Sequence, residues 1–247
     1  MGDFLSGSVE LSIVLIIVIG LLYVTIKNVF KGKGILPLIG NIMGYFPTVV
    51  HEFGHVIGCK LMFGRVGDIV LLHTRKNQEI KGAYGYAVTY NKGRIARAFK
   101  AFLGYLAPPV LIYLIVYLNS VEKVSVALII LLIGSLYLLI KTSNKLPVMV
   151  NLGTIGVITY VVLNEGILEG YGMVVVGIIL SLLIGLLLGE TVFSMINMWR
   201  MWWGNHTTWD GYVIKKEVLI PVIITIVAWY VSIGYVIYQT IIILSTE

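Results

Sequence analysis

Long apolar segments constrain the fold of this chain more than any other feature of its sequence. They lie at about 9–29, 35–62, 98–118, 124–140, 146–163, 173–195 and 218–244. A transmembrane helix needs about 20 consecutive apolar residues, and most of these segments reach or approach that length. Glycine pairs within them, Gly40–Gly44 and Gly185–Gly189, favour close helix packing. We therefore expect an all-α polytopic membrane protein with about seven transmembrane segments.

The composition agrees with a lipid environment. Hydrophobic residues make up 58% of the 247 positions and charged residues only 12%, whereas a soluble domain carries about a quarter charged residues. No long polar stretch could hold a second core, so we expect one integral membrane domain over residues 1–247. The net charge of +6 comes from loops, where lysine and arginine contact anionic lipid headgroups. We therefore expect contact with a lipid bilayer and no nucleic-acid binding.

Lysine and arginine residues are distributed unevenly between the two sides of the expected membrane segments. When the loops are assigned to alternate sides, 14 of the 18 lysines and arginines fall on the side of the N-terminus. The positive-inside rule places that side in the cytoplasm. Residues 51–55 and the loop that holds Asp210 belong to the same side. The acidic, lysine-free start of the chain favours a retained membrane helix over a cleaved signal peptide.

The region 65–94 interrupts the apolar pattern. The runs 68–78 and 84–90 are rich in β-branched and aromatic residues and are separated by polar residues and glycine, which indicates a hairpin. We expect a small β-hairpin or sheet at the membrane surface. Its free edge could pair with an extended substrate, or the segment could be a structural loop, and the sequence leaves both open.

A polar motif, His51-Glu52-Phe53-Gly54-His55, lies inside the second apolar segment. Its histidines stand at i and i+4, so on a helix they share one face and can bind one metal ion. In this motif the glutamate lies beside a zinc-bound water, takes its proton and returns it to the leaving amine. Zinc lowers the pKa of that water from about 15.7 to about 7. The motif predicts His51 and His55 as zinc ligands and Glu52 as the general base.

The apolar surroundings of this motif strengthen its interpretation. A charged side chain at the centre of a membrane helix costs roughly 2.5–3.5 kcal/mol, so polar residues within a membrane are functional candidates. The alternative is a polar patch on an interfacial helix whose hydrogen bonds are satisfied. That alternative requires three polar residues to coincide in a metal-binding pattern.

A catalytic zinc ion has three protein ligands and one water, so the two histidines need a third partner. Asp210 is the first candidate because its loop shares a membrane side with the motif, although Asp-Gly is also a common turn pair. His206 is the next candidate, since zinc binds histidine readily. Glu190 lies within an apolar segment and is a further candidate, and it could equally pair with Arg200 or a backbone group.

Three parts of the chain resemble the site-2 protease family of intramembrane zinc metalloproteases. Residues 47–58 match its metal motif with apolar flanks, Asp210-Gly211 resembles its distal aspartate-glycine pair, and residues 102–109 resemble the small-residue and proline turn of its third core helix. The similarity is closer still to the compact bacterial branch without a PDZ domain. It implies that His51, His55 and Asp210 hold one zinc ion, that Glu52 is the base, and that a substrate helix must unwind to enter.

The loop before Asp210 departs from that family's pattern. It reads Asn205 to Trp209 without a proline, so the residues that orient the substrate are unnamed. Together these features predict a zinc-dependent intramembrane endopeptidase in a bacterial cell membrane, with the mouth of its active site toward the cytoplasm. Its expected partners are membrane-protein or membrane-peptide substrates. The alternatives are a catalytically silent protease-like chaperone or regulator, and a metal-binding transporter.

Overall fold

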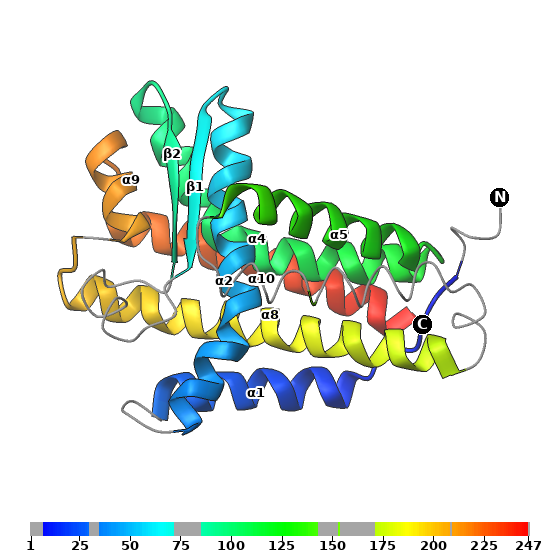
Figure 1. The fold of residues 1–247 in the computed structure, drawn as a ribbon. Coiled ribbons are helices and arrows are strands. Elements are labelled where there is room, and N and C mark those ends of the chain that lie inside the picture. The colour runs from blue at the N-terminus through cyan, green and yellow to red at the C-terminus, as the bar shows by residue number, and fades with distance from the viewer. Residues whose placement is uncertain are drawn as a thin grey trace.

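The computed structural model describes residues 7–29, 35–71, 85–142, 153, 171–207 and 209–246. Helices form most of this part of the chain, and two short strands follow the second helix (Figure 1). The elements in chain order are α1 (Ile13–Val29), α2 (Ile35–Leu61), β1 (Arg65–Leu71), β2 (Gly85–Tyr90), α4 (Arg94–Ser120), α5 (Val124–Lys141), α8 (Tyr171–Trp203), α9 (Asp210–Val218) and α10 (Val222–Thr246).

Four of the described helices are long and apolar enough to cross a membrane, namely α4, α5, α8 and α10. The chain is therefore a mostly helical integral membrane protein. Helix α1 is apolar but has only 17 residues, and the expected segment 146–163 lies outside the described residues. The total of about seven crossings stays a prediction.

The last apolar segment, expected over about 218–244, is present as α10, which begins four residues later at Val222. Leu219 adopts a left-handed conformation with φ 61° and ends α9, and Pro221 precedes the first residue of α10. Proline suits the start of a helix because the backbone N–H it lacks has no partner there. The break leaves α9 as a separate short helix that begins at Asp210.

Helix α2 runs across the long helices in the view of Figure 1, whereas α1, α4, α5, α8 and α10 extend along the length of the molecule. The main core lies between α4, α5 and α8, where Val116, Leu128 and Leu180 are almost completely buried. Because α2 crosses this bundle, the middle of α2 meets both α4 and α8. That middle part holds residues 51–55.

Helices α1 and α8 approach each other through glycine. A Cβ atom placed on Gly185 would lie 2.9 Å from the Ile16 carbonyl oxygen, and one on Gly189 would lie 2.9 Å from the Gly20 carbonyl oxygen. Real Cβ atoms do not approach other atoms so closely, so both positions require glycine at this helix spacing. The packing role predicted for the Gly185–Gly189 pair is confirmed.

The predicted β element is present as a two-stranded antiparallel sheet. Arg65 pairs with Tyr90 and Leu71 with Gly85, with an irregularity between Val66 and Ile69. The first strand begins at Arg65, three residues before the expected start, and the connection 72–84 lies outside the described residues. Ile69 is completely buried against α2 and α5, so the sheet is fixed beside the metal motif.

Candidate active site

His51 and His55 lie on one face of α2, and their ring centroids are 4.9 Å apart. The spacing follows from helix geometry, which places residues i and i+4 one above the other. Between them, Gly54 allows close contact with α4, because a Cβ atom there would lie 2.9 Å from the Gly104 Cα and the Ala107 Cβ atoms. The two imidazoles therefore project from a helix that is packed tightly against its neighbour.

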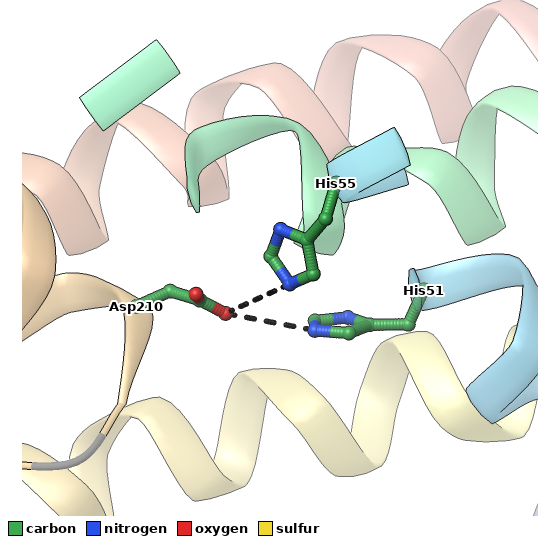
Figure 2. Close-up of side chains that lie close together, drawn as sticks. All are labelled: His51, His55 and Asp210. Carbon is green, nitrogen blue, oxygen red and sulfur yellow. Dashed lines mark ion pairs between the residues drawn. The ribbon is translucent and has the colours of Figure 1, made fainter. Parts of the chain in front are cut away.

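Asp210 comes from a distant part of the sequence and is the first residue of α9. Its Oδ2 atom lies 3.5 Å from the Nε2 atom of His51 and 3.5 Å from the Nε2 atom of His55 (Figure 2). One ligand atom from each residue can be chosen so that all three lie within 4.8 Å of one another. The structure thus brings the two motif histidines and this aspartate to a common point.

The spacing of these atoms fits a zinc ion. Ligand atoms about 2.1 Å from a tetrahedral zinc ion lie about 3.4 Å from each other, which is close to the 3.5 Å between Asp210 and each histidine. Two imidazoles and one carboxylate are a common ligand set for catalytic zinc. Three protein ligands leave a fourth position open for a water or a substrate.

The electrostatics of Asp210 suit a metal ligand. Burial alone would raise the pKa of its carboxyl, but His55 and His51 outweigh burial and hold the pKa below its ordinary value. The carboxylate form persists near neutral pH, and that form is the one that binds a metal ion.

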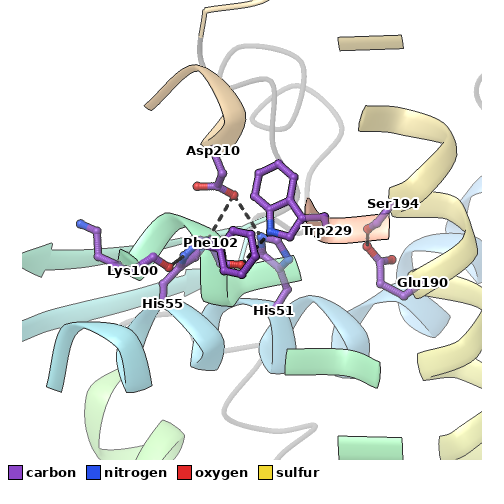
Figure 3. Close-up of polar contacts among 8 residues, drawn as sticks. All are labelled: His51, His55, Lys100, Phe102, Glu190, Ser194, Asp210 and Trp229. Atoms are coloured by element: carbon purple, nitrogen blue, oxygen red, sulfur yellow. Dashed lines mark hydrogen bonds and ion pairs between the residues drawn. The ribbon is translucent and has the colours of Figure 1, made fainter. Parts of the chain in front are cut away.

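A backbone contact orients His55. Its Nδ1 atom lies 2.9 Å from the carbonyl oxygen of Lys100 on α4 (Figure 3). Because a carbonyl oxygen only accepts, Nδ1 donates this hydrogen bond, which leaves Nε2 as the ring atom that can bind a metal ion. Gly104 makes room for this ring, since a Cβ atom there would lie 2.7 Å from its Nε2 atom.

Glu52 lies next to the histidine pair and is only 5% exposed. Ala87 of β2 lines the same cavity, and its backbone contributes to the electrostatic environment of the Glu52 carboxylate. The second strand thus borders the side chain that the sequence predicts as the base. A buried carboxylate beside a metal site can accept a proton from a bound water.

These groups line one cavity of about 340 Å³. Its walls come from α2, β2, α4, α8 and α9, so elements from both halves of the chain enclose it. Its polar lining includes Glu52, Thr89, Lys100, Tyr105, Glu190 and Ser194. Such a cavity can hold a short peptide segment and water next to the metal ligands.

An ion pair attaches α9, and with it Asp210, to α4. The Arg97 guanidinium donates two hydrogen bonds of 2.7 Å to the two carboxylate oxygens of Glu217. This pairing lowers the pKa of Glu217 below its ordinary value, chiefly through the hydrogen bond itself. Trp209, immediately before Asp210, packs against Trp229 of α10 with ring centroids 6.2 Å apart.

The two other predicted ligands lie outside the metal-ligand group. Glu190 borders the same cavity, but its carboxylate accepts hydrogen bonds from the hydroxyls of Tyr23 and Ser194. The suggested pairing of Glu190 with Arg200 is wrong, because Arg200 donates to Asn28 at 2.6 Å. His206 is exposed and lines a separate cavity of about 460 Å³.

Sequence reasoning missed the residues that support the site from outside. Lys100 acts through its backbone carbonyl, which any residue type provides, so its identity gives no signal. Gly104 does lie in the segment 102–109 that resembles a family motif, but the contact of this glycine with His55 depends on how α2 and α4 cross.

Comparison with known proteins agrees with this geometry. A family model described as Peptidase M50B-like matches residues 11–240. No curated protein and no solved structure matches the chain. The matched region contains both the 51–55 motif and Asp210. The described residues form helices and one two-stranded sheet, and no PDZ domain is evident among them.

Proposed function

Because this chain belongs to the Peptidase M50B-like family of site-2 proteases, we propose that it is a zinc-dependent intramembrane endopeptidase. The family indicates a protease. One observation carries the finer proposal: His51, His55 and Asp210 converge in a cavity that also contains the buried carboxylate of Glu52. The sequence motif could not supply a third ligand by itself, and Asp210, which we propose for that role, belongs to a different helix.

In the proposed hydrolysis of a peptide bond, different residues of the cavity bind the metal ion and transfer protons. His51, His55 and Asp210 would hold the metal ion, which would supply Lewis acidity and make a bound water more acidic. Glu52 would take a proton from the attacking water and return it to the amine of the leaving segment. Burial of Glu52 beside the histidine pair keeps its carboxylate near both transfers.

The substrates we propose are peptide bonds of membrane-embedded proteins or peptides. A peptide carbonyl in a helix is occupied by its own hydrogen bond, so the substrate must unwind locally before attack. Strand β2 contributes Gly85, Tyr86, Ala87 and Thr89 to the cavity wall. An unwound segment that lies along this wall would be extended, and strand pairing would then hold it.

The cavity is proposed to open toward the cytoplasm of a bacterial cell. Supporting this, α9 and the sheet lie in Figure 1 at the end of the molecule where α4 begins. The expectation that the N-terminus shares this side is wrong, because Gly7 pairs with Lys123 at the far end of α4. Several basic residues belong to these elements or to the start of α4, namely Arg65, Arg94, Arg97, Lys215 and Lys216. Clustered lysine and arginine favour the cytoplasmic side.

The decisive experiment separates metal binding from proton transfer. Glu52→Gln keeps the shape of the side chain but removes its basicity, so we expect one zinc ion per chain and no cleavage. Membrane proteomes of cells that carry wild type or Glu52→Gln would be compared for uncleaved helices that accumulate in the variant. Glu122→Gln is the matched control, because Glu122 is exposed between α4 and α5.

Metal analysis of the purified protein distinguishes this proposal from a silent chaperone or a transporter. We expect one tightly bound zinc per chain that is lost in His55→Ala. Cleavage that persists in Glu52→Gln, or in protein freed of metal, would contradict the proposed mechanism.

A further inference from the structure

Tyr105 lies against the metal ligands without being one of them. It follows Ala101 by one turn on α4, and both residues line the cavity. Its ring meets the His51 imidazole edge to face, with centroids 4.8 Å apart. The position places a phenol group directly beside the point where His51, His55 and Asp210 converge.

A second aromatic contact fixes the orientation of this ring. The centroid of Trp229 lies 4.7 Å from that of Tyr105 on the side of α10. Trp229 is completely buried, and its Nε1 atom donates a 2.8 Å hydrogen bond to the Phe102 carbonyl oxygen (Figure 3). Tyr105 therefore contacts both the His51 imidazole and a buried indole, and these two contacts restrict the orientation of its ring.

Tyr105 shares its cavity with three acidic residues, Asp210, Glu190 and Glu52. Among the hydrogen bonds of the described residues, none involves the Tyr105 hydroxyl. Tyr105 therefore adds an uncommitted hydrogen-bond donor to a cavity that contains three carboxylates.

Two neighbouring donors of the cavity have partners of their own. The Lys100 ammonium directs one of its three N–H groups to the Thr89 hydroxyl at 2.7 Å, and the Ser194 hydroxyl donates to Glu190 at 2.9 Å. Peptide hydrolysis places negative charge on the scissile carbonyl oxygen when water adds to the carbonyl carbon. A fixed donor beside that oxygen stabilises the transition state more than the substrate.

We propose that the Tyr105 hydroxyl donates a hydrogen bond to the scissile carbonyl oxygen as that oxygen gains charge. The proposal rests on the proposed endopeptidase function and names a further catalytic residue for it. Tyr105 keeps its own proton throughout, so the proton transfers assigned to Glu52 are unchanged. The ring of Tyr105 also packs edge to face against the His51 imidazole, a contact that does not depend on the hydroxyl.

The change Tyr105→Phe tests the hydroxyl alone, because phenylalanine preserves both ring contacts. With a membrane peptide that wild type cleaves and Glu52→Gln does not, we expect kcat to fall about 100-fold, as for loss of one oxyanion donor, with KM and zinc content unchanged. A two-leucine phosphinate peptide, which mimics the tetrahedral transition state, should bind more weakly by a similar factor. Tyr113→Phe on the same helix is the matched control, since Tyr113 stacks on Tyr117.

The results that would overturn this inference differ from those that would overturn the proposed function. If wild type binds zinc and the phosphinate peptide, but Tyr105→Phe matches it in kcat and phosphinate affinity, Tyr105 has no catalytic role. Loss of zinc from Tyr105→Phe would also overturn it, because the hydroxyl would then act through His51. Wild type that binds neither zinc nor the phosphinate would instead contradict the protease function itself.

Discussion

The Nδ1 atom of His55 on α2 lies 2.9 Å from the carbonyl oxygen of Lys100 on α4. A ligand carried by one helix is thus oriented by the backbone of another. Partners of this kind fix the tautomer of a metal-binding histidine, and their loss commonly lowers metal affinity about 10-fold to 100-fold. Metal affinity should therefore depend on how closely α2 and α4 pack.

Gly104→Ala tests this dependence. The added Cβ atom would lie 2.7 Å from the His55 Nε2 atom, so the ring must move away from Lys100 or from Asp210. We expect zinc affinity to fall by roughly 10-fold to 100-fold, measured by competition with a chelator. Gly134→Ala is the control, because no atom outside its own helix turn lies within 4 Å of the added carbon. Equal zinc affinity in the two variants would refute the role of Gly104.

Substitution of the predicted third ligands separates Asp210 from His206. Asp210→Ala removes an atom 3.5 Å from both histidine nitrogens, so we expect zinc to be lost on dialysis. His206→Ala should retain a full zinc ion, because His206 lines the other cavity. Elemental analysis of both purified variants gives the answer, and the opposite pattern would reassign the third ligand.

The ion pair between Arg97 and Glu217 should contribute to zinc affinity through the position of α9. Arg97→Gln and Glu217→Gln each remove both 2.7 Å hydrogen bonds, and we expect roughly twofold to fivefold weaker zinc binding from each change, the range for exposed pairs. The double variant should lose no more than one single variant, because the changes act on one interaction. Additive losses would show that the two residues act separately.

Glycine at the contact of α1 and α8 should be required for stability. In Gly185→Leu the Cβ atom alone would lie 2.8 Å from the Ile19 Cβ atom and 2.9 Å from the Ile16 carbonyl oxygen. Overpacking of this kind costs about 1–3 kcal/mol, so the melting temperature in detergent should fall by several degrees. Gly234→Leu on α10 is the control, since a Cβ atom there meets nothing within 4 Å. A melting temperature equal to that of the control would argue against tight packing here.

Much of the metal site could be predicted because its signal is local. The spacing of His51 and His55 is a property of one helix, and i and i+4 place both rings on one face wherever that helix lies. The two-stranded sheet also follows from local composition, although Arg65 rather than Asp68 begins it. The ends of α5 likewise lie within one residue of the apolar segment 124–140.

Other features depend on contacts between distant parts of the chain, which local patterns do not encode. Pro221 in the apolar run 218–244 is compatible with a helix start, but the left-handed conformation of Leu219 that ends α9 has no local signal in the sequence. Glu190 satisfies its carboxylate through Tyr23 of α1, which lies far away in sequence. The two ring contacts of Tyr105 require both His51 of α2 and Trp229 of α10 to pack against α4. Only the assembled helices reveal these partners.

The distance in sequence between His55 and Asp210 has a consequence for how the protein is held together. More than half of the chain lies between these two residues, so an ion bound to both would join α2 to α9 as a crosslink does. Closing so long a loop restricts the unfolded chain, and binding to the folded state alone shifts the equilibrium toward it. The same ion that equips the cavity for hydrolysis would thereby stabilise the packing of the helices that enclose it.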